Sequence, residues 1–216
     1  MSTEIVAYAS LLTLSRKDVI SLKLRDAYSL HKIVYGLFEN RRTHEEDRSS
    51  PSGFLYVDQG SEFHDSHFRG RRILILSDRR PHFTPSCGTL AIKPVSSSFL
   101  AFDHYIFEVT VNPTKRDRNS GKIIPVTGYD AIRRWFSDRA VTSWGFSVSP
   151  DSLDVSDVGV QQFFKSGQRI THGCATLKGM LRVVDRERFI RSFKHGLGRG
   201  KAFGFGLLQI APCPNT

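Results

Sequence analysis

A histidine near the N-terminus is the best-placed candidate for proton transfer. The segment 27–39 is expected to be a helix that Asp26 caps, because its apolar residues recur at helical spacing: Leu30, Val34 and Leu37. Tyr28, His31 and Tyr35 share one stripe beside that apolar face. An imidazole with its ordinary pKa of about 6.5 can give or take a proton near neutral pH. Periodicity alone favours a half-buried structural histidine, so a catalytic role needs further support.

A second segment with suggestive chemistry lies close to the C-terminus, at residues 194–210, KHGLGRGKAFGFGLLQI. Five glycines fall between positions 196 and 206, with Arg199 and Lys201 among them. Glycine permits positive φ and close backbone approach, and bare N–H groups beside two cations form a cradle for phosphate oxygens. The alternative is a tight helix-to-strand connection whose glycines serve packing. For Gly204 and Gly206 the sequence favours neither the phosphate-binding nor the packing interpretation over the other.

This segment fails the patterns of three known glycine motifs. A phosphate-binding P-loop needs a glycine where His195 stands and a serine or threonine where Ala202 stands. A dinucleotide fingerprint needs a strand before it and a helix after it, which is the reverse of the order expected here. The RNA-recognition signature lies on an internal strand, and Lys201 replaces one of its aromatic residues. These failures argue against a nucleotide-binding enzyme.

The distribution of charge points to a polyanionic partner. The chain of 216 residues carries a net charge of +10. Residues 165–216 alone hold ten Lys or Arg and two acids, a net +8. A surface that serves only solubility tends to mix the two signs, whereas a one-sided basic field favours nucleic acid. A basic surface without a partner is the alternative.

No pattern in the chain indicates a metal ion or another cofactor. The carboxylates at 45–47 lie in a polar segment and are typical of a solvated charge run. His64 and His67 could form a metal pair, but no third ligand is evident. The cysteines are few and far apart: Cys87, Cys174 and Cys213. They favour a reducing cytoplasm over a disulfide framework. Neither a signal peptide nor an apolar run of about 18 residues is present, so we expect no membrane association.

The order of expected elements predicts an α+β fold of two tandem ferredoxin-like domains, each βαββαβ. The first half has strands at 4–14, 54–57, 71–78 and 89–95 around the helix at 27–39. Pro81 and Pro85 leave its second helix short or missing. The second half opens with a long strand in 103–116 that ends at Pro113, followed by helices at 128–144 and 186–197, a hairpin turning at 166–167 and a last strand at 203–212. We place the domains at 1–97 and 98–216.

Three segments resemble the CRISPR-associated CasE family of Cas6-type endoribonucleases. The most specific is GLGRGKAFGFGLLQI preceded by LKGMLRVVDRERFIRSF; ILILSDRRP at 73–81 and VTVNPTKR at 109–116 follow the family in the same order. The resemblance implies two ferredoxin-like domains and an enzyme that processes CRISPR repeat RNA (pre-crRNA) within Cascade. It also implies that the glycine-rich loop helps to bind an RNA hairpin. The expected partners are therefore the repeat RNA, or the mature crRNA, and other Cascade subunits.

The resemblance also assigns roles to individual residues. The catalytic Tyr-x-x-His of the family matches Tyr28 and His31. His31 would act as general acid toward the 5′-oxygen or as base toward the 2′-hydroxyl, and Tyr28 would orient the reacting groups. Basic hairpin and loop residues would bind the RNA: Lys165, Arg169, Lys178, Lys194, Gly198, Arg199, Gly200 and Lys201. His195 is a rival candidate, although a cation favoured by the helix dipole is the preferred interpretation.

The reaction expected from this resemblance needs no metal, because RNA supplies its own 2′-hydroxyl nucleophile. Attack on the neighbouring phosphate leaves a 2′,3′-cyclic phosphate and a 5′-hydroxyl, and the protein contributes geometry, proton transfer and positive charge. The alternative is a non-catalytic RNA-binding subunit of the same fold.

Overall fold

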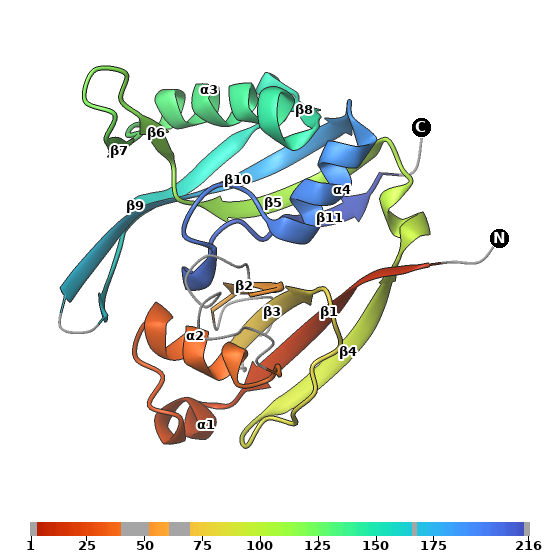
Figure 1. Ribbon diagram of the computed structural model, residues 1–216, viewed down its shortest axis with the longest axis vertical. Coiled ribbons are helices and arrows are strands. Elements are labelled where there is room, and N and C mark those ends of the chain that lie inside the picture. Colours follow the sequence, from red (N-terminus) through yellow and green to blue (C-terminus); the bar gives the residue numbers. More distant parts are fainter. Residues whose placement is uncertain (1–3, 40–51, 61–69, 166–167, 214–216) are drawn as a thin grey trace. The chain divides into compact units, whose positions relative to one another are not determined.

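The computed structural model describes residues 4–39, 52–60, 70–165 and 168–213. The chain divides into two compact units, residues 1–97 with 202–204 and residues 98–201 with 205–216. Each unit contains an antiparallel sheet with helices packed on it (Figure 1). The strand order of each sheet is that of a ferredoxin-like domain, so the predicted fold class is confirmed.

The described part of the first unit contains six helices and strands: β1 (Ile5–Leu14), α1 (Arg16–Ser21), α2 (Ala27–Tyr35), β2 (Phe54–Asp58), β3 (Arg71–Ser77) and β4 (Thr89–Ser96). Its four strands pair in the order β2-β3-β1-β4. No helix forms in the described segment between β3 and β4. Pro81 and Pro85 lie in that segment, and each lacks the N–H that a helix would need. The second helix of this ferredoxin-like unit is therefore missing, as the two prolines predicted.

Helix α2 covers one face of the first sheet because its apolar stripe matches the strands beneath it. Leu30 and Val34 are buried against β-strand residues that include Leu12 and Ile75. Asp26 begins the helix: its side chain accepts the Ser29 N–H at 2.8 Å, and Ser29 binds back to the N-cap backbone. This reciprocal cap satisfies two N–H groups that would otherwise lack partners. The helix and its cap were both predicted from sequence, but the helix ends at Tyr35 and not at residue 39.

The second unit has these regular elements: β5 (His104–Val111), β6 (Thr114–Arg116), β7 (Ile123–Pro125), α3 (Tyr129–Arg139), β8 (Phe146–Val148), β9 (Asp154–Lys165), β10 (Gln168–Val183), α4 (Arg186–His195) and β11 (Gln209–Pro212). The sheet order is β11-β5-β10-β8, with β9 paired to β10 and a separate β6–β7 ribbon. Helices α3 and α4 cover the same face (Figure 1), since Phe107 stacks on Phe136 at 5.7 Å and Tyr105 contacts Phe189 at 5.3 Å.

Several boundaries differ from the sequence prediction. The strand expected to end at Pro113 ends at Val111, and a short ribbon follows it. The helix expected to continue to residue 144 widens into a π-turn after Arg139. The last strand begins at Gln209 rather than at 203. Gly204 and Gly206 have φ of +86° and +83°, a conformation that no strand adopts.

Gly206 is required by the packing of the second unit. Its N–H donates to Thr110 O at 2.7 Å, and its carbonyl accepts the Leu197 N–H at 2.8 Å. A Cβ at this position would lie 2.3 Å from Leu197 O, whereas a Cβ at Gly198 would meet no atom within 4 Å. The packing interpretation therefore holds for Gly206, and Gly198 keeps its backbone open to a ligand.

We predict that Gly206→Ala destabilises the protein much more than Gly198→Ala. Both substitutions place a Cβ in the left-handed region, at a cost of about 1–2 kcal/mol. Only Gly206→Ala adds overpacking against a backbone carbonyl, which costs about 1–3 kcal/mol more. Urea unfolding of the two variants measures the difference. Equal losses of unfolding free energy would contradict this account of the loop.

Candidate functional site

His31 lies in the middle of α2 and is half-buried among aromatic rings of the first unit. Its ring centroid is 5.9 Å from Tyr35, 6.2 Å from Phe54, 6.3 Å from Tyr56 and 6.4 Å from Phe203. Tyr35 precedes the helix C-cap, and Phe54 and Tyr56 come from β2. The imidazole is therefore surrounded by rings from three segments of the chain: α2 itself, β2 and the segment around Phe203. These rings limit the directions from which a substrate can reach it.

The contact with Phe203 comes from the glycine-rich loop. Residues 202–204 belong to the first unit, whereas the chain on both sides of them belongs to the second. The Tyr56 hydroxyl lies 2.8 Å from Ala202 O and 3.2 Å from Ala27 O, so a single donor connects this loop segment to the first turn of α2. A Cβ at Gly204 would come within 3.4 Å of the Tyr56 ring. That distance is an ordinary contact, so glycine is favoured at this position by its φ of +86° and not by lack of space.

Tyr56 acts in this arrangement as a neutral donor. Its side chain is almost fully buried, and that burial, with a smaller effect from the Asp58 carboxylate, raises the pKa of the phenol far above its ordinary value. The hydroxyl therefore keeps its proton at any physiological pH. The sequence analysis missed Tyr56 and Phe203, because each has the same pattern as a core aromatic residue.

Tyr28 lies one turn before His31 on α2 and is also half-buried. The Lys32 ammonium lies 4.5 Å from the centroid of the Tyr28 ring, which is a cation–π distance. The helix therefore presents a phenol, an ammonium group and an imidazole within two turns. The catalytic roles of Tyr28 and His31 remain predictions.

The basic residues predicted around the glycines belong to the second unit. Lys194 and the rival His195 occupy the last turn of α4 and are exposed, which suits cations at a helix C-terminus. Arg199 is exposed, and Lys201 is half-buried in a short 3₁₀ turn. Burial lowers the pKa of the Lys201 ammonium. An anion that binds beside Lys201 would offset the cost of that desolvation.

Gly198 and Gly200 differ in their surroundings although both have positive φ, +70° and +81°. Gly198 is exposed, and a Cβ there would meet nothing, but a Cβ at Gly200 would lie 2.8 Å from the Phe205 ring. A direct backbone contact to RNA is therefore easier to accommodate at Gly198. The RNA-binding roles of both glycines remain predictions.

The three basic residues assigned to the hairpin occupy different positions in it. Residues 168–174 of β10 pair only with β9, so this end of the hairpin extends beyond β5 (Figure 1). Arg169 is exposed there and hydrogen-bonds to Gln162. Lys165 pairs through its backbone with Gln168, but its side chain lies outside the described structure. Lys178 is far from this end, in the sheet itself, where its ammonium lies 3.1 Å from Glu108.

The β6–β7 ribbon carries further exposed cations that the sequence analysis did not select: Lys115, Arg116, Arg118 and Lys122. Arg116 donates to Gly121 O at 2.7 Å, which helps to close the turn of the ribbon. The sequence does show this cluster of positive charge, because TKRDRNSGK at 114–122 contains four basic residues and one acid.

The described residues contain no group of three or more side chains suited to hold a metal ion. His64, His67 and the carboxylates at 45–47, which the sequence analysis considered, lie outside the described residues. No helix in the described part of the chain is long and apolar enough to cross a membrane.

Comparison with known proteins identifies the family. The family model described as CRISPR associated protein matches residues 7–212. A relative from Thermus thermophilus, the CRISPR-associated endoribonuclease Cse3, is 26% identical over 130 residues. That alignment covers 56% of this chain and 61% of the relative, so it spans less than two thirds of the relative's length.

Solved structures share the fold over nearly the whole chain. Cse3 of Thermus thermophilus bound to an RNA that represents a pre-cleavage complex superposes with a TM-score of 0.75 at 20% identity, covering 95% of this chain and 99% of that one. Cas6e from Escherichia coli K-12 gives a TM-score of 0.66 at 22% identity, covering 95% of this chain and 100% of that one. The chain belongs to the family of CRISPR-associated proteins, and the CasE-type resemblance of its sequence is confirmed.

Proposed function

We propose that this protein is a metal-independent endoribonuclease that cleaves CRISPR repeat RNA at the base of a repeat hairpin and stays bound to the product within Cascade. The observation that carries the proposal is the placement of His31 among the aromatic rings of α2, β2 and the glycine-rich loop. The relatives support it, since they include the CRISPR-associated endoribonuclease Cse3 and a chain of a CRISPR RNA-guided surveillance complex.

Cleavage in this proposal uses the RNA's own nucleophile. The 2′-hydroxyl oxygen forms a bond to phosphorus as the bond from phosphorus to the 5′-oxygen breaks, which leaves a 2′,3′-cyclic phosphate and a 5′-hydroxyl. The 2′-oxygen loses one proton and the 5′-oxygen gains one. His31 supplies one of these two transfers, which is worth about 10²- to 10⁴-fold in rate. Tyr28 orients the nucleophile or the phosphate.

Binding of the RNA in this proposal depends on the basic residues of the second unit. Arg199 and Lys201 lie among glycines whose N–H groups can also face phosphates. Arg169 on the projecting hairpin, together with Lys165, Lys178 and Lys194, adds positive charge for the repeat stem. The alternative function, an RNA-binding subunit without catalysis, uses the same surface and predicts no role for His31.

We predict that His31→Ala abolishes cleavage and leaves RNA binding nearly unchanged. Proton transfer is lost with the imidazole, whereas binding depends on many phosphate contacts. The measurement is single-turnover cleavage of a repeat RNA, with affinity measured by filter binding. His82→Ala is the matched control, because His82 is an exposed histidine of the same unit. Full activity of His31→Ala would remove His31 from the mechanism and make His195 the next residue to test.

A second prediction concerns the nucleophile. Wild-type cleavage should continue in excess EDTA, and a 2′-deoxy substitution at the nucleotide 5′ of the cut should stop the reaction without releasing the RNA. Mapping of the product ends should show a cyclic phosphate and a 5′-hydroxyl. Cleavage of the deoxy substrate, or a complete loss of activity in EDTA with the fold intact, would rule out this scheme.

A third prediction concerns the glycine-rich loop. Replacing Arg199 and Lys201 together by alanine should weaken repeat-RNA binding and flatten its salt dependence, because each phosphate contact contributes roughly 0.7–0.9 to the log–log slope. Arg134→Ala with Arg139→Ala is the matched control, since it removes two exposed cations from α3 of the same unit. If the loop variant and the control keep the same affinity and slope, the loop serves packing and not RNA binding.

A further inference from the structure

The β6–β7 ribbon of the second unit carries positive charge for which the proposed function gives no role. Residues 114–122 contain four cations and a single acid, Asp117. The Asp117 carboxylate accepts the Ser120 hydroxyl at 2.7 Å and the Ser120 N–H at 2.8 Å, and these bonds lower its pKa. None of the four cations forms an ion pair in the described part of the chain. A concentration of unpaired cations on one short element favours a polyanionic partner.

The register of the ribbon divides its side chains between two faces. Arg116 is directly opposite Ile123, whereas Lys115 is directly opposite Ile124. Opposed residues of an antiparallel pair share a face of the ribbon, and successive residues of a strand alternate between the faces. Arg116 therefore shares its face with Ile123 and with Thr114, and Lys115 lies on the other face with Ile124.

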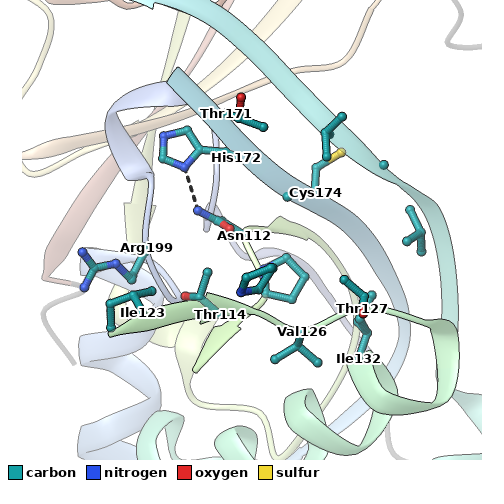
Figure 2. Close-up of a pocket in the computed structure, with 16 residues that line it drawn as sticks. Asn112, Thr114, Ile123, Val126, Thr127, Ile132, Thr171, His172, Cys174 and Arg199 are labelled. Carbon is teal, nitrogen blue, oxygen red and sulfur yellow. Dashed lines mark hydrogen bonds between the residues drawn. The ribbon is translucent and has the colours of Figure 1, made fainter. Parts of the chain in front are cut away.

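The face that carries Arg116 continues to Arg199 of the glycine-rich loop. Thr114 and Ile123 line a cavity at the base of the ribbon, and Arg199 lines the same cavity (Figure 2). The backbones of Asn112 and Arg199 form an antiparallel bridge, which holds the loop against the start of the ribbon. Arg199, which the proposed function assigns to RNA binding, therefore lies on the same side of the ribbon as Arg116.

The guanidinium of Arg116 is held in a way that suits a phosphate. Its Nη1 donates to Gly121 O at 2.7 Å, and this is the one hydrogen bond of the guanidinium in the described part of the chain. The side chain is exposed, so its other N–H groups are free for a planar, bidentate contact with phosphate oxygens. Because one bond already holds the side chain, less rotamer entropy is lost when a phosphate binds.

We propose that the backbone of a bound RNA follows the face of the β6–β7 ribbon that carries Arg116, in continuation of its contact with Arg199. The partner is RNA, so this inference rests on the proposed function and adds Arg116 to its phosphate contacts. Contacts to phosphate carry no sequence information. The ribbon therefore adds affinity for the repeat hairpin and for an unrelated hairpin alike, and it does not select the repeat sequence.

The first experiment compares Arg116→Gln with Lys115→Gln, because each variant removes one exposed cation of β6 but from opposite faces. Affinities for the repeat hairpin and for an unrelated hairpin are measured by filter binding over a range of salt concentrations. Arg116→Gln should lower the log–log salt slope by roughly 0.7–0.9 for both RNAs, so its loss of affinity should shrink about threefold when salt is raised about fourfold. Lys115→Gln should keep the wild-type slope.

A charge added to the same face gives a second test, which does not disturb the hydrogen bond between Arg116 and Gly121. Ile123 is 40% exposed and lies opposite Arg116, so Ile123→Lys adds a cation with little loss of packing. This variant should bind both RNAs more tightly and raise the salt slope by roughly 0.7–0.9. Ile123→Gln is the matched control, because it changes the same side chain without adding charge.

The proposal is wrong if Arg116→Gln, shown by urea unfolding to be folded, keeps the wild-type affinity and slope, or if Ile123→Lys leaves both unchanged. It is also wrong if Lys115→Gln lowers the slope as much as Arg116→Gln does, because the RNA would then not be confined to one face. Wild-type cleavage of the repeat RNA, measured in parallel, tests the proposed function separately. A wild type that binds RNA through Arg116 but cleaves none would contradict the proposed function and support the ribbon contact.

Discussion

The hydrogen bonds of the Tyr56 hydroxyl are the interaction on which the candidate site depends. This hydroxyl is buried, so it needs an acceptor, and it finds two backbone carbonyls from segments far apart in the chain, Ala202 and Ala27. One segment is the glycine-rich loop and the other is the first turn of α2. The donor thus fixes the distance between Phe203 and the helix that carries His31.

The glycines of the C-terminal loop have different structural roles, although they belong to one sequence motif. Gly206 permits backbone hydrogen bonds to Thr110 and Leu197 within the second unit, and Gly204 adopts a positive φ beside the Tyr56 ring within the first. Gly198 has neither role: it is exposed, it directly precedes Arg199, and a Cβ there would meet no atom within 4 Å. Packing and phosphate binding are therefore not alternatives for the loop as a whole, because different glycines suit different functions.

The parts of the fold that the sequence predicted are those with local signals. The helix that carries His31 shows its apolar period and its Asp26 cap, and the missing second helix of the first unit follows from Pro81 and Pro85. The contacts of Tyr56 and Phe203 with His31 could not be predicted, because they join different elements, 172 positions apart in the case of Phe203, and leave no periodic pattern.

The most direct test of this account is the single-turnover cleavage rate of Tyr56→Phe at saturating protein. The substitution keeps the buried ring and removes only the hydroxyl that holds residues 202–204 against α2. We predict a cleavage rate about 2- to 13-fold lower, which corresponds to the loss of one buried hydrogen bond of about 0.5–1.5 kcal/mol, with repeat-RNA affinity unchanged. A folded Tyr56→Phe variant that cleaves as fast as the wild type would contradict it.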